Sequence, residues 1–226
     1  KAYKTVVIDP YNFSKSDIEK LHKDGKTVYG YLNVGSLEEF RPYFERFKNI
    51  TLGTYENWPD EHWLDVTAEA WQSFVVHELG KEYAKKGIDG FFIDNADVYY
   101  QYPKEESFKA LCSIMRELKE YRLKILINGG DVFVSRCIDE NIASELFDGI
   151  NQECVFTGID FENKSYGAQE KAETERYKEY LSRVRAASLE IYLLEYGADA
   201  ARSTLIEAYC KQIGAKWYNA KSLELK

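Results

Sequence analysis

Acidic residues follow several apolar runs of this sequence, at the points where the runs end. The clearest run, Phe91 to Ile93, is followed at once by Asp94, Asn95 and Asp97. In parallel α/β folds the carboxyl ends of the strands carry the chemistry, because the loops that follow them meet at one edge. The other carboxylates at such exits are Asp9, Asp131, Glu153 and Glu195. We therefore expect a cluster of carboxylates at one end of the fold.

Paired carboxylates are what hydrolysis of a glycosidic bond requires. One carboxyl group donates a proton to the leaving oxygen, while the other attacks the sugar or activates water. Two like charges close together raise the pKa of one of them, which leaves an acid beside a base. The same residue types have other uses, since an Asp after a strand can cap a helix. Asp94 and Asp97 could also bind a divalent metal, given further oxygen ligands.

Aromatic residues near the acidic exits suit a carbohydrate ligand. The C–H faces of a sugar stack on rings, while its hydroxyls need fixed hydrogen-bond partners. The candidate stacking platforms are Tyr11, Trp58, Trp63, Tyr99 and Tyr196. The candidate polar contacts to hydroxyls or an amine are Asp9, Asn95, Asp97, Asn128 and Glu195.

Composition and motifs argue against several other classes of protein. The 226 residues include 30 Lys and Arg against 38 Asp and Glu, and the formal charge of −8 disfavours a nucleic-acid partner. No apolar run reaches the ~18 residues of a membrane span, and no glycine-rich nucleotide loop follows a strand. The four cysteines and three histidines lack the spacing of a metal site, so we expect neither a metal nor another cofactor.

Strands and helices alternate along the chain, as in a parallel sheet with right-handed crossovers. The seven expected strands cover residues 5–9, 27–34, 90–95, 124–128, 147–153, 191–196 and 215–219. A helix over 68–86 is expected to be capped by Thr67, and residues 35–66 are too long for a simple connection. A closed barrel needs eight strands, so either one precedes residue 1 or the barrel is open on one side. We expect one domain over residues 1–226.

The chain resembles glycoside hydrolase family 114, the endo-α-1,4-polygalactosaminidase barrels, in six ordered segments: YLNVGSLEEFRPYF, WPDEHWLDV, GIDGFFIDNADVY, ILINGG, INQECVF and YLLEYGA. The resemblance implies a (β/α)8 TIM-like barrel and retaining hydrolysis of galactosamine-rich polysaccharide. It also implies a secreted protein, extracellular or associated with the cell envelope. The catalytic pair of the family corresponds to Asp94 and Glu153 here. The opening strand of the family has no match before residue 5, so this chain is expected to lack it.

We therefore predict a secreted glycoside hydrolase that cleaves an amino-sugar-rich polysaccharide with Asp94 and Glu153 as its carboxylate pair. A protonated amino sugar would be attracted, since a cleft lined by one sign of charge concentrates the opposite charge. The alternative from another class is a polysaccharide-binding barrel without turnover. In an active enzyme the two carboxyl groups should face each other at ~5 to 10 Å.

Overall fold

The computed structural model describes residues 3–223, and its contacts divide them between two compact units. Unit 1 extends to Phe133 and also includes Glu145–Phe147. Unit 2 comprises Val134–Ser144 and the chain from Asp148 onward. The prediction of a single domain stays a prediction.

Unit 1 is built on four parallel strands in the order β1, β2, β6, β7. These are β1 (Thr5–Ile8), β2 (Thr27–Asn33), β6 (Gly90–Asp94) and β7 (Lys124–Asn128). Asn33 pairs with Asp94 and Ile93 pairs with Ile127, so the strands end along a common edge. Each of the four begins and ends within one residue of its predicted position, which places the predicted acidic exits of unit 1 at that edge.

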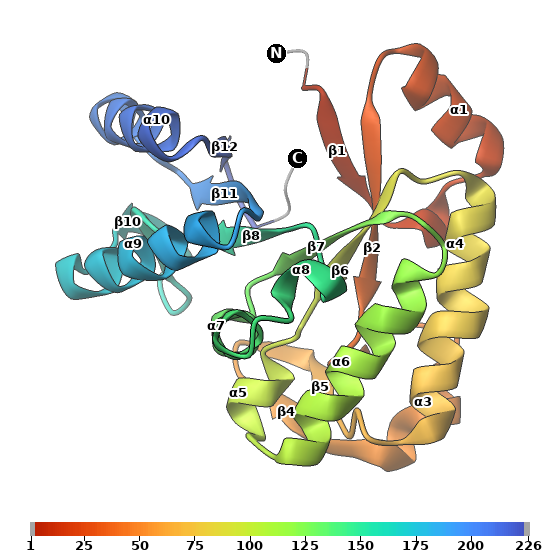
Figure 1. The fold of residues 1–226 in the computed structure, drawn as a ribbon. Coiled ribbons are helices and arrows are strands. Elements are labelled where there is room, and N and C mark those ends of the chain that lie inside the picture. The colour runs from red at the N-terminus through yellow and green to blue at the C-terminus, as the bar shows by residue number, and fades with distance from the viewer. Residues whose placement is uncertain (1–2, 224–226) are drawn as a thin grey trace. The chain divides into compact units, whose positions relative to one another are not determined.

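Helices cover this sheet (Figure 1). They are α1 (Lys15–Lys23), α3 (Glu69–Ser73), the π-helical η3 (Phe74–Gly80), α4 (Lys81–Lys86), α5 (Val98–Gln101) and α6 (Glu105–Lys119), with the 3-10 turn η1 (Pro10–Asn12) after β1. The predicted helix at 68–86 is thus one run with a π-helical middle. Its N-cap is Ala68, and the prediction of Thr67 is wrong because that hydroxyl donates to Asp65 Oδ1 at 2.6 Å instead.

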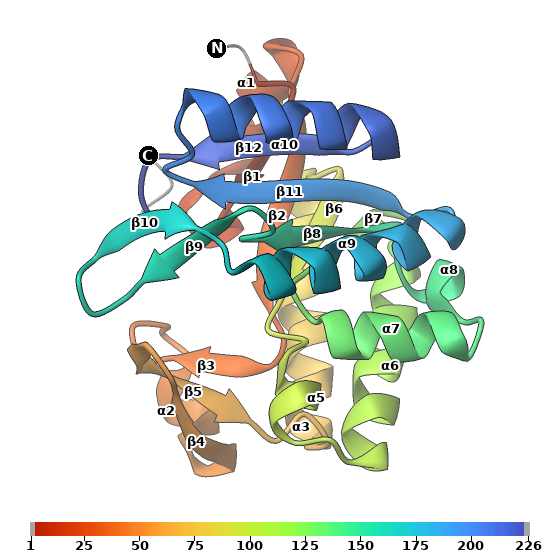
Figure 2. The ribbon, with the colours of Figure 1, turned by 90° about the vertical axis from the view of Figure 1, so that its left-hand side faces the viewer.

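The long excursion after β2 folds as a small antiparallel sheet with strand order β3, β5, β4 (Figure 2). Its strands are β3 (Ser36–Glu38), β4 (Thr51–Tyr55) and β5 (Trp58–Leu64), and it also contains α2 (Phe44–Phe47) and the 3-10 turn η2 (Lys48–Ile50). β3 begins three residues after β2 ends, and Glu38 pairs with Glu61 where β3 lies antiparallel to β5. The excursion therefore brings two glutamates to the carboxyl end of β2.

Unit 2 contains three parallel strands in the order β8, β11, β12. They are β8 (Gly149–Glu153), β11 (Glu190–Tyr196) and β12 (Lys216–Ala220), and the helices of this part are α9 (Lys171–Ala186) and α10 (Ala200–Ile213). Two more helices, α7 (Asp131–Asp139) and α8 (Ala143–Leu146), contain residues of both units. A hairpin of β9 (Thr157–Asp160) and β10 (Ser165–Ala168) follows β8 (Figure 2). Glu153 pairs with Leu194, so the exits of β8 and β11 lie side by side.

Residues 3–223 therefore hold seven parallel strands, four in unit 1 and three in unit 2, as predicted. Helices alternate with these strands, which confirms the predicted fold class, a (β/α)8 TIM-like plan with seven of its strands in this part of the chain. Strands β2, β6, β7, β8 and β11 carry buried apolar residues, with Leu32, Phe91, Ile127, Ile150 and Leu193 each at most 1% exposed, whereas β1 and β12 are less buried. Such near-continuous apolar runs are typical of parallel sheets covered by helices.

Candidate active site

Asp94 ends β6, and both of its carboxylate oxygens are held. The Tyr31 hydroxyl donates to Oδ2 at 2.9 Å, and the Asn128 amide donates to Oδ1 at 2.9 Å. The two donors come from β2 and β7, the strands on either side of β6. Burial raises the pKa of Asp94 above its usual range, while the bonds from Asn128 and Tyr31 oppose that shift. This carboxyl group is therefore fixed in orientation and holds a proton more readily than an exposed aspartate does.

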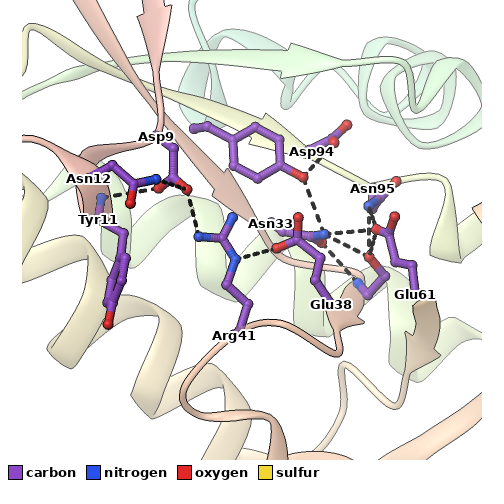
Figure 3. Close-up of polar contacts among 11 residues, drawn as sticks. Asp9, Tyr11, Asn12, Asn33, Glu38, Arg41, Glu61, Asp94 and Asn95 are labelled. Carbon is purple, nitrogen blue, oxygen red and sulfur yellow. Dashed lines mark hydrogen bonds and ion pairs between the residues drawn. The ribbon is translucent and has the colours of Figure 1, made fainter. Parts of the chain in front are cut away.

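A second carboxylate, Glu61 of β5, lies in the same network (Figure 3). Its Oε1 accepts hydrogen bonds from Asn33 Nδ2 at 3.0 Å, from Asn95 Nδ2 at 2.7 Å and from the Ser36 hydroxyl. Burial is the main cause that raises the pKa of Glu61, and the charge of Asp94 adds to it. Asn95 reaches this position because its backbone is left-handed (φ 62°), a conformation that asparagine tolerates. The predicted ligand contact Asn95 is thus a structural partner of Glu61.

Arg41 bridges two further carboxylates (Figure 3). Its Nη1 donates to Asp9 Oδ2 at 2.8 Å, and its Nε donates to Glu38. The Arg41 side chain is only 6% exposed. Burial raises the pKa of Glu38, and the bond from Arg41 opposes that shift. Asp9 also accepts from the Tyr11 N–H at 3.0 Å, so its charge is engaged within unit 1 and attracts a ligand cation less than expected.

Asp97 follows Asp94 in the chain and lies directly before α5. Each of its carboxylate oxygens accepts from the Gly130 N–H at 3.0 Å. Burial raises the pKa of Asp97 to about 7. Its side chain makes no capping bond to α5, so it is not the helix cap that an aspartate after a strand often provides.

Glu153 ends β8 in unit 2 and is held by a tyrosine from the neighbouring strand. The Tyr196 hydroxyl donates to Glu153 Oε2 at 2.7 Å. The Tyr196 ring stacks on Tyr166 of β10, with ring centroids 5.9 Å apart and planes inclined by 16°. Unit 2 therefore presents a half-buried, oriented carboxylate at a strand exit. Its pairing with Asp94 stays a prediction.

Glu195 is completely buried, and its carboxylate is used inside unit 2. Its Oε2 accepts from the Thr157 hydroxyl at 2.6 Å and from the Thr157 N–H at 2.9 Å, and the Phe156 N–H donates to both oxygens. Burial raises the pKa of Glu195, and these bonds oppose the shift. A side chain without exposed surface does not touch a sugar, so Glu195 supports the turn after β8 instead of the predicted ligand contact.

Two of the five predicted stacking platforms expose their rings. Tyr11 is 52% exposed and Trp58 is 43% exposed. The other three are at most 8% exposed: Trp63, Tyr99 and Tyr196. These three pack inside their units, which leaves Tyr11 and Trp58 as the candidates with an open face.

Five polar residues of the unit 1 site were not predicted from the sequence: Tyr31, Asn33, Glu38, Arg41 and Glu61. Tyr31 and Asn33 carried a usable signal, because polar side chains at alternate positions near the end of a buried strand point to one face. The other three lie on the excursion after β2, where their positions depend on the register of β3 with β5, which the sequence does not reveal.

The unit 1 site suits proton transfer. Three neighbouring carboxyl groups, Asp94, Glu61 and Glu38, have raised pKa values and fixed hydrogen-bond partners. A carboxyl group shifted toward neutrality by burial serves as a general acid or base. Among residues 3–223, no group of three or more His, Cys, Asp or Glu side chains could hold a metal ion.

A model of the glycoside-hydrolase family GH114 matches residues 1–224. Among solved structures, the glycoside hydrolase domain of PelA from Pseudomonas aeruginosa has a TM-score of 0.83 at 18% identity, over 99% of this chain and 88% of that one. Ega3 from Aspergillus fumigatus, in complex with galactosamine, has a TM-score of 0.74 at 16% identity, over 99% and 85%.

The α-galactosidase TtGalA from Thermus thermophilus is a more distant likeness, with a TM-score of 0.59 at 16% identity. It is matched over 90% of this chain and 45% of that one. No curated protein matches the chain. At these identities the structural likenesses show the fold alone.

Proposed function

We propose, since the chain belongs to the glycoside-hydrolase family GH114, that it hydrolyses an amino-sugar-rich polysaccharide by means of Asp94 and Glu153. Family membership supports a glycoside hydrolase that acts on polysaccharide. The observation that carries the residue assignment is the environment of Asp94, a carboxyl group with a raised pKa, held at a strand exit by donors from both neighbouring strands. Glu153 supports it from unit 2, where Tyr196 orients it at an equivalent strand exit.

The two carboxyl groups share the steps of a retaining mechanism. One attacks the anomeric carbon while the other protonates the leaving oxygen, and the second then activates the water that releases the glycosyl intermediate. The raised pKa of Asp94 is compatible with either role, because a buried carboxyl can be the acid or a poorly solvated nucleophile. We therefore assign the pair jointly.

The amino-sugar preference rests on the charges that stay available in the site. Arg41 is shared between Asp9 and Glu38, whereas Asp94 and Glu61 form no ion pair within residues 3–223 and supply negative charge for a ligand. Oε1 of Glu61 has three donors, whereas Oε2 accepts no hydrogen bond from residues 3–223. A protonated amine has three N–H donors and suits such an acceptor. The galactosamine bound to the structurally similar Ega3 supports the same preference.

We further propose that the protein works outside the cell or in the cell envelope. No helix within residues 3–223 is long and apolar enough to cross a membrane. A polymeric substrate is too large to enter a cell and would be met outside it. The exposed rings of Tyr11 and Trp58 are our candidates for stacking on sugar units of that polymer.

Mass spectrometry of the products released from a panel of amino-sugar polymers tests the proposal. Polygalactosamine, its N-acetylated form, chitosan and a neutral galactan are incubated with the wild-type protein and with Asp94→Asn. We expect oligosaccharides from a polymer with free amines in the wild-type reaction and none above background with the variant. Binding to a polymer without any product would support a non-catalytic polysaccharide-binding barrel and overturn the proposed hydrolysis.

A further inference from the structure

Asp97 is a half-buried carboxylate that the proposed reaction does not use. Both of its oxygens accept from one backbone donor, the Gly130 N–H, at 3.0 Å each. Asp97 therefore links the segment after β6 to the turn after β7, and these two strands are neighbours in the sheet.

The turn at Gly129 and Gly130 packs tightly against the segment that carries Asp97. Gly129 and Gly130 both have φ of 61°, the left-handed region in which glycine is unstrained. A Cβ at Gly129 would lie 2.8 Å from Asp97 Oδ2, and one at Gly130 would lie 2.9 Å from the Ala96 Cβ. The turn and the segment that carries Asp97 are therefore in close contact, with no room for a side chain between them.

The turn begins at a residue that contacts Asp94. Asn128 is the last residue of β7 and directly precedes Gly129. Its side-chain Nδ2 donates to Asp94 Oδ1 at 2.9 Å. The Asn128 side chain and the turn branch from the same Cα atom, so a shift of the turn backbone is expected to change the direction of that amide group.

We propose that Asp97 is a positioning residue that holds the turn Asn128–Gly129–Gly130 and thereby aims the Asn128 amide at Asp94. The assignment of Asp94 as a catalytic carboxylate rests on the proposed function. The coupling itself is a property of unit 1 and does not depend on any reaction.

The charges around Asp97 decide how its variants must be compared. Burial raises the pKa of Asp97, and the negative charges of Asp94 and Asp131 add to the shift while the Gly130 N–H opposes it. Replacing Asp97 removes a charge that also acts on Asp94 directly. Asp97→Asn and Asp97→Ala remove the same charge, but only the asparagine keeps an oxygen that can accept from Gly130. The difference between these two variants isolates the hydrogen bond.

The test measures the pKa of Asp94 from its 13C carboxyl signal during a pH titration of the full chain. The two Asp97 variants are each prepared with Asn128 intact and with Asn128→Ala. With Asn128 intact, we expect the pKa of Asp94 to be at least ~0.5 unit higher in Asp97→Ala than in Asp97→Asn, because a donor to the ionised form is misplaced. With Asn128→Ala the difference should vanish, as non-additivity requires for residues that act through one another.

Two outcomes overturn the proposal. A difference of the same size in both Asn128 backgrounds would mean that Asp97 acts on Asp94 by another route. No difference in either background would mean that the turn does not couple them. Thermal unfolding of each variant shows whether it is folded. A purely structural role of Asp97 would lower stability, but it would not make the difference in the pKa of Asp94 depend on Asn128.

If Asp97→Ala does not fold, the proposal is tested in the wild-type protein by a pH titration. The Asn128 side-chain amide 15N signals should then move with the midpoint of the separately assigned Asp97 carboxyl 13C signal. If the Gly130 amide signal follows Asp97 and the Asn128 side chain does not, the proposal is refuted. Because these measurements need no substrate, a failure here is distinct from a failure of the proposed hydrolysis.

Discussion

Tyr31→Phe removes the hydroxyl that donates to Asp94 Oδ2 at 2.9 Å and leaves the ring in place. That bond favours the ionised carboxylate and opposes the effect of burial, so its loss must raise the pKa of Asp94 further. A hydrogen bond to a charged group contributes about 1.5–3 kcal/mol. Since 1.36 kcal/mol corresponds to one pKa unit, and the Asn128 bond remains, we expect an upward shift of about 1 unit.

The assay is the pH dependence of kcat/KM, which reports the ionisations of the free enzyme. If Asp94 reacts as the ionised partner, the acid limb of the profile moves up by about 1 pH unit. If Asp94 is the proton donor, the alkaline limb moves up by the same amount, so the direction is upward in either role. Tyr192→Phe is the matched control, because the Tyr192 hydroxyl bonds Glu190 and Lys216 in unit 2. A profile unchanged in Tyr31→Phe, or a limb moved downward, would refute the reasoning.

Two further outcomes are expected. Arg41→Met should lower the free energy of urea unfolding by about 3 kcal/mol, because it leaves Asp9 and Glu38 as uncompensated, partly buried charges. Arg46→Met is the control: its arginine side chain is 51% exposed, so the free energy of unfolding should change by less than about 1 kcal/mol. Equal effects of the two substitutions would contradict the burial argument. The ratio of kcat/KM for a deacetylated oligosaccharide to kcat/KM for its N-acetylated form should exceed one. This ratio should decrease when the salt concentration is raised from 0.1 M to 1 M, because the Debye length shrinks from ~10 to ~3 Å. A ratio insensitive to salt would show that charge does not select the substrate.

The strand exits could be predicted from the sequence because their signal is local. An apolar run that ends at a carboxylate, as Phe91–Ile93 does before Asp94, specifies both the strand and the residue at which it ends. Glu153 follows from the same pattern at the end of β8. All seven predicted strands are present, because a short apolar run is a local signal whether or not a carboxylate follows it.

The partners of those carboxylates could not be predicted, because they depend on pairings between distant residues. Glu61 is 33 residues before Asp94 and meets its network only through the register of β3 with β5. Arg41 reaches Asp9 from the same excursion, although nothing in its sequence context separates it from an exposed arginine. Glu195 shows the converse, since this carboxylate at the exit of β11 is buried and accepts hydrogen bonds from the backbone of the turn after β8.

The turnover of one defined oligosaccharide by the wild-type protein, Asp94→Asn and Glu153→Gln tests the central claim most directly. The substrate is a deacetylated galactosamine oligomer, and thermal unfolding confirms that each variant is folded. Each variant is expected to lower kcat by at least ~10²-fold, because a positioned acid–base group contributes 10² to 10⁴. Near-normal turnover by either folded variant would contradict the assignment of Asp94 and Glu153 as the catalytic pair.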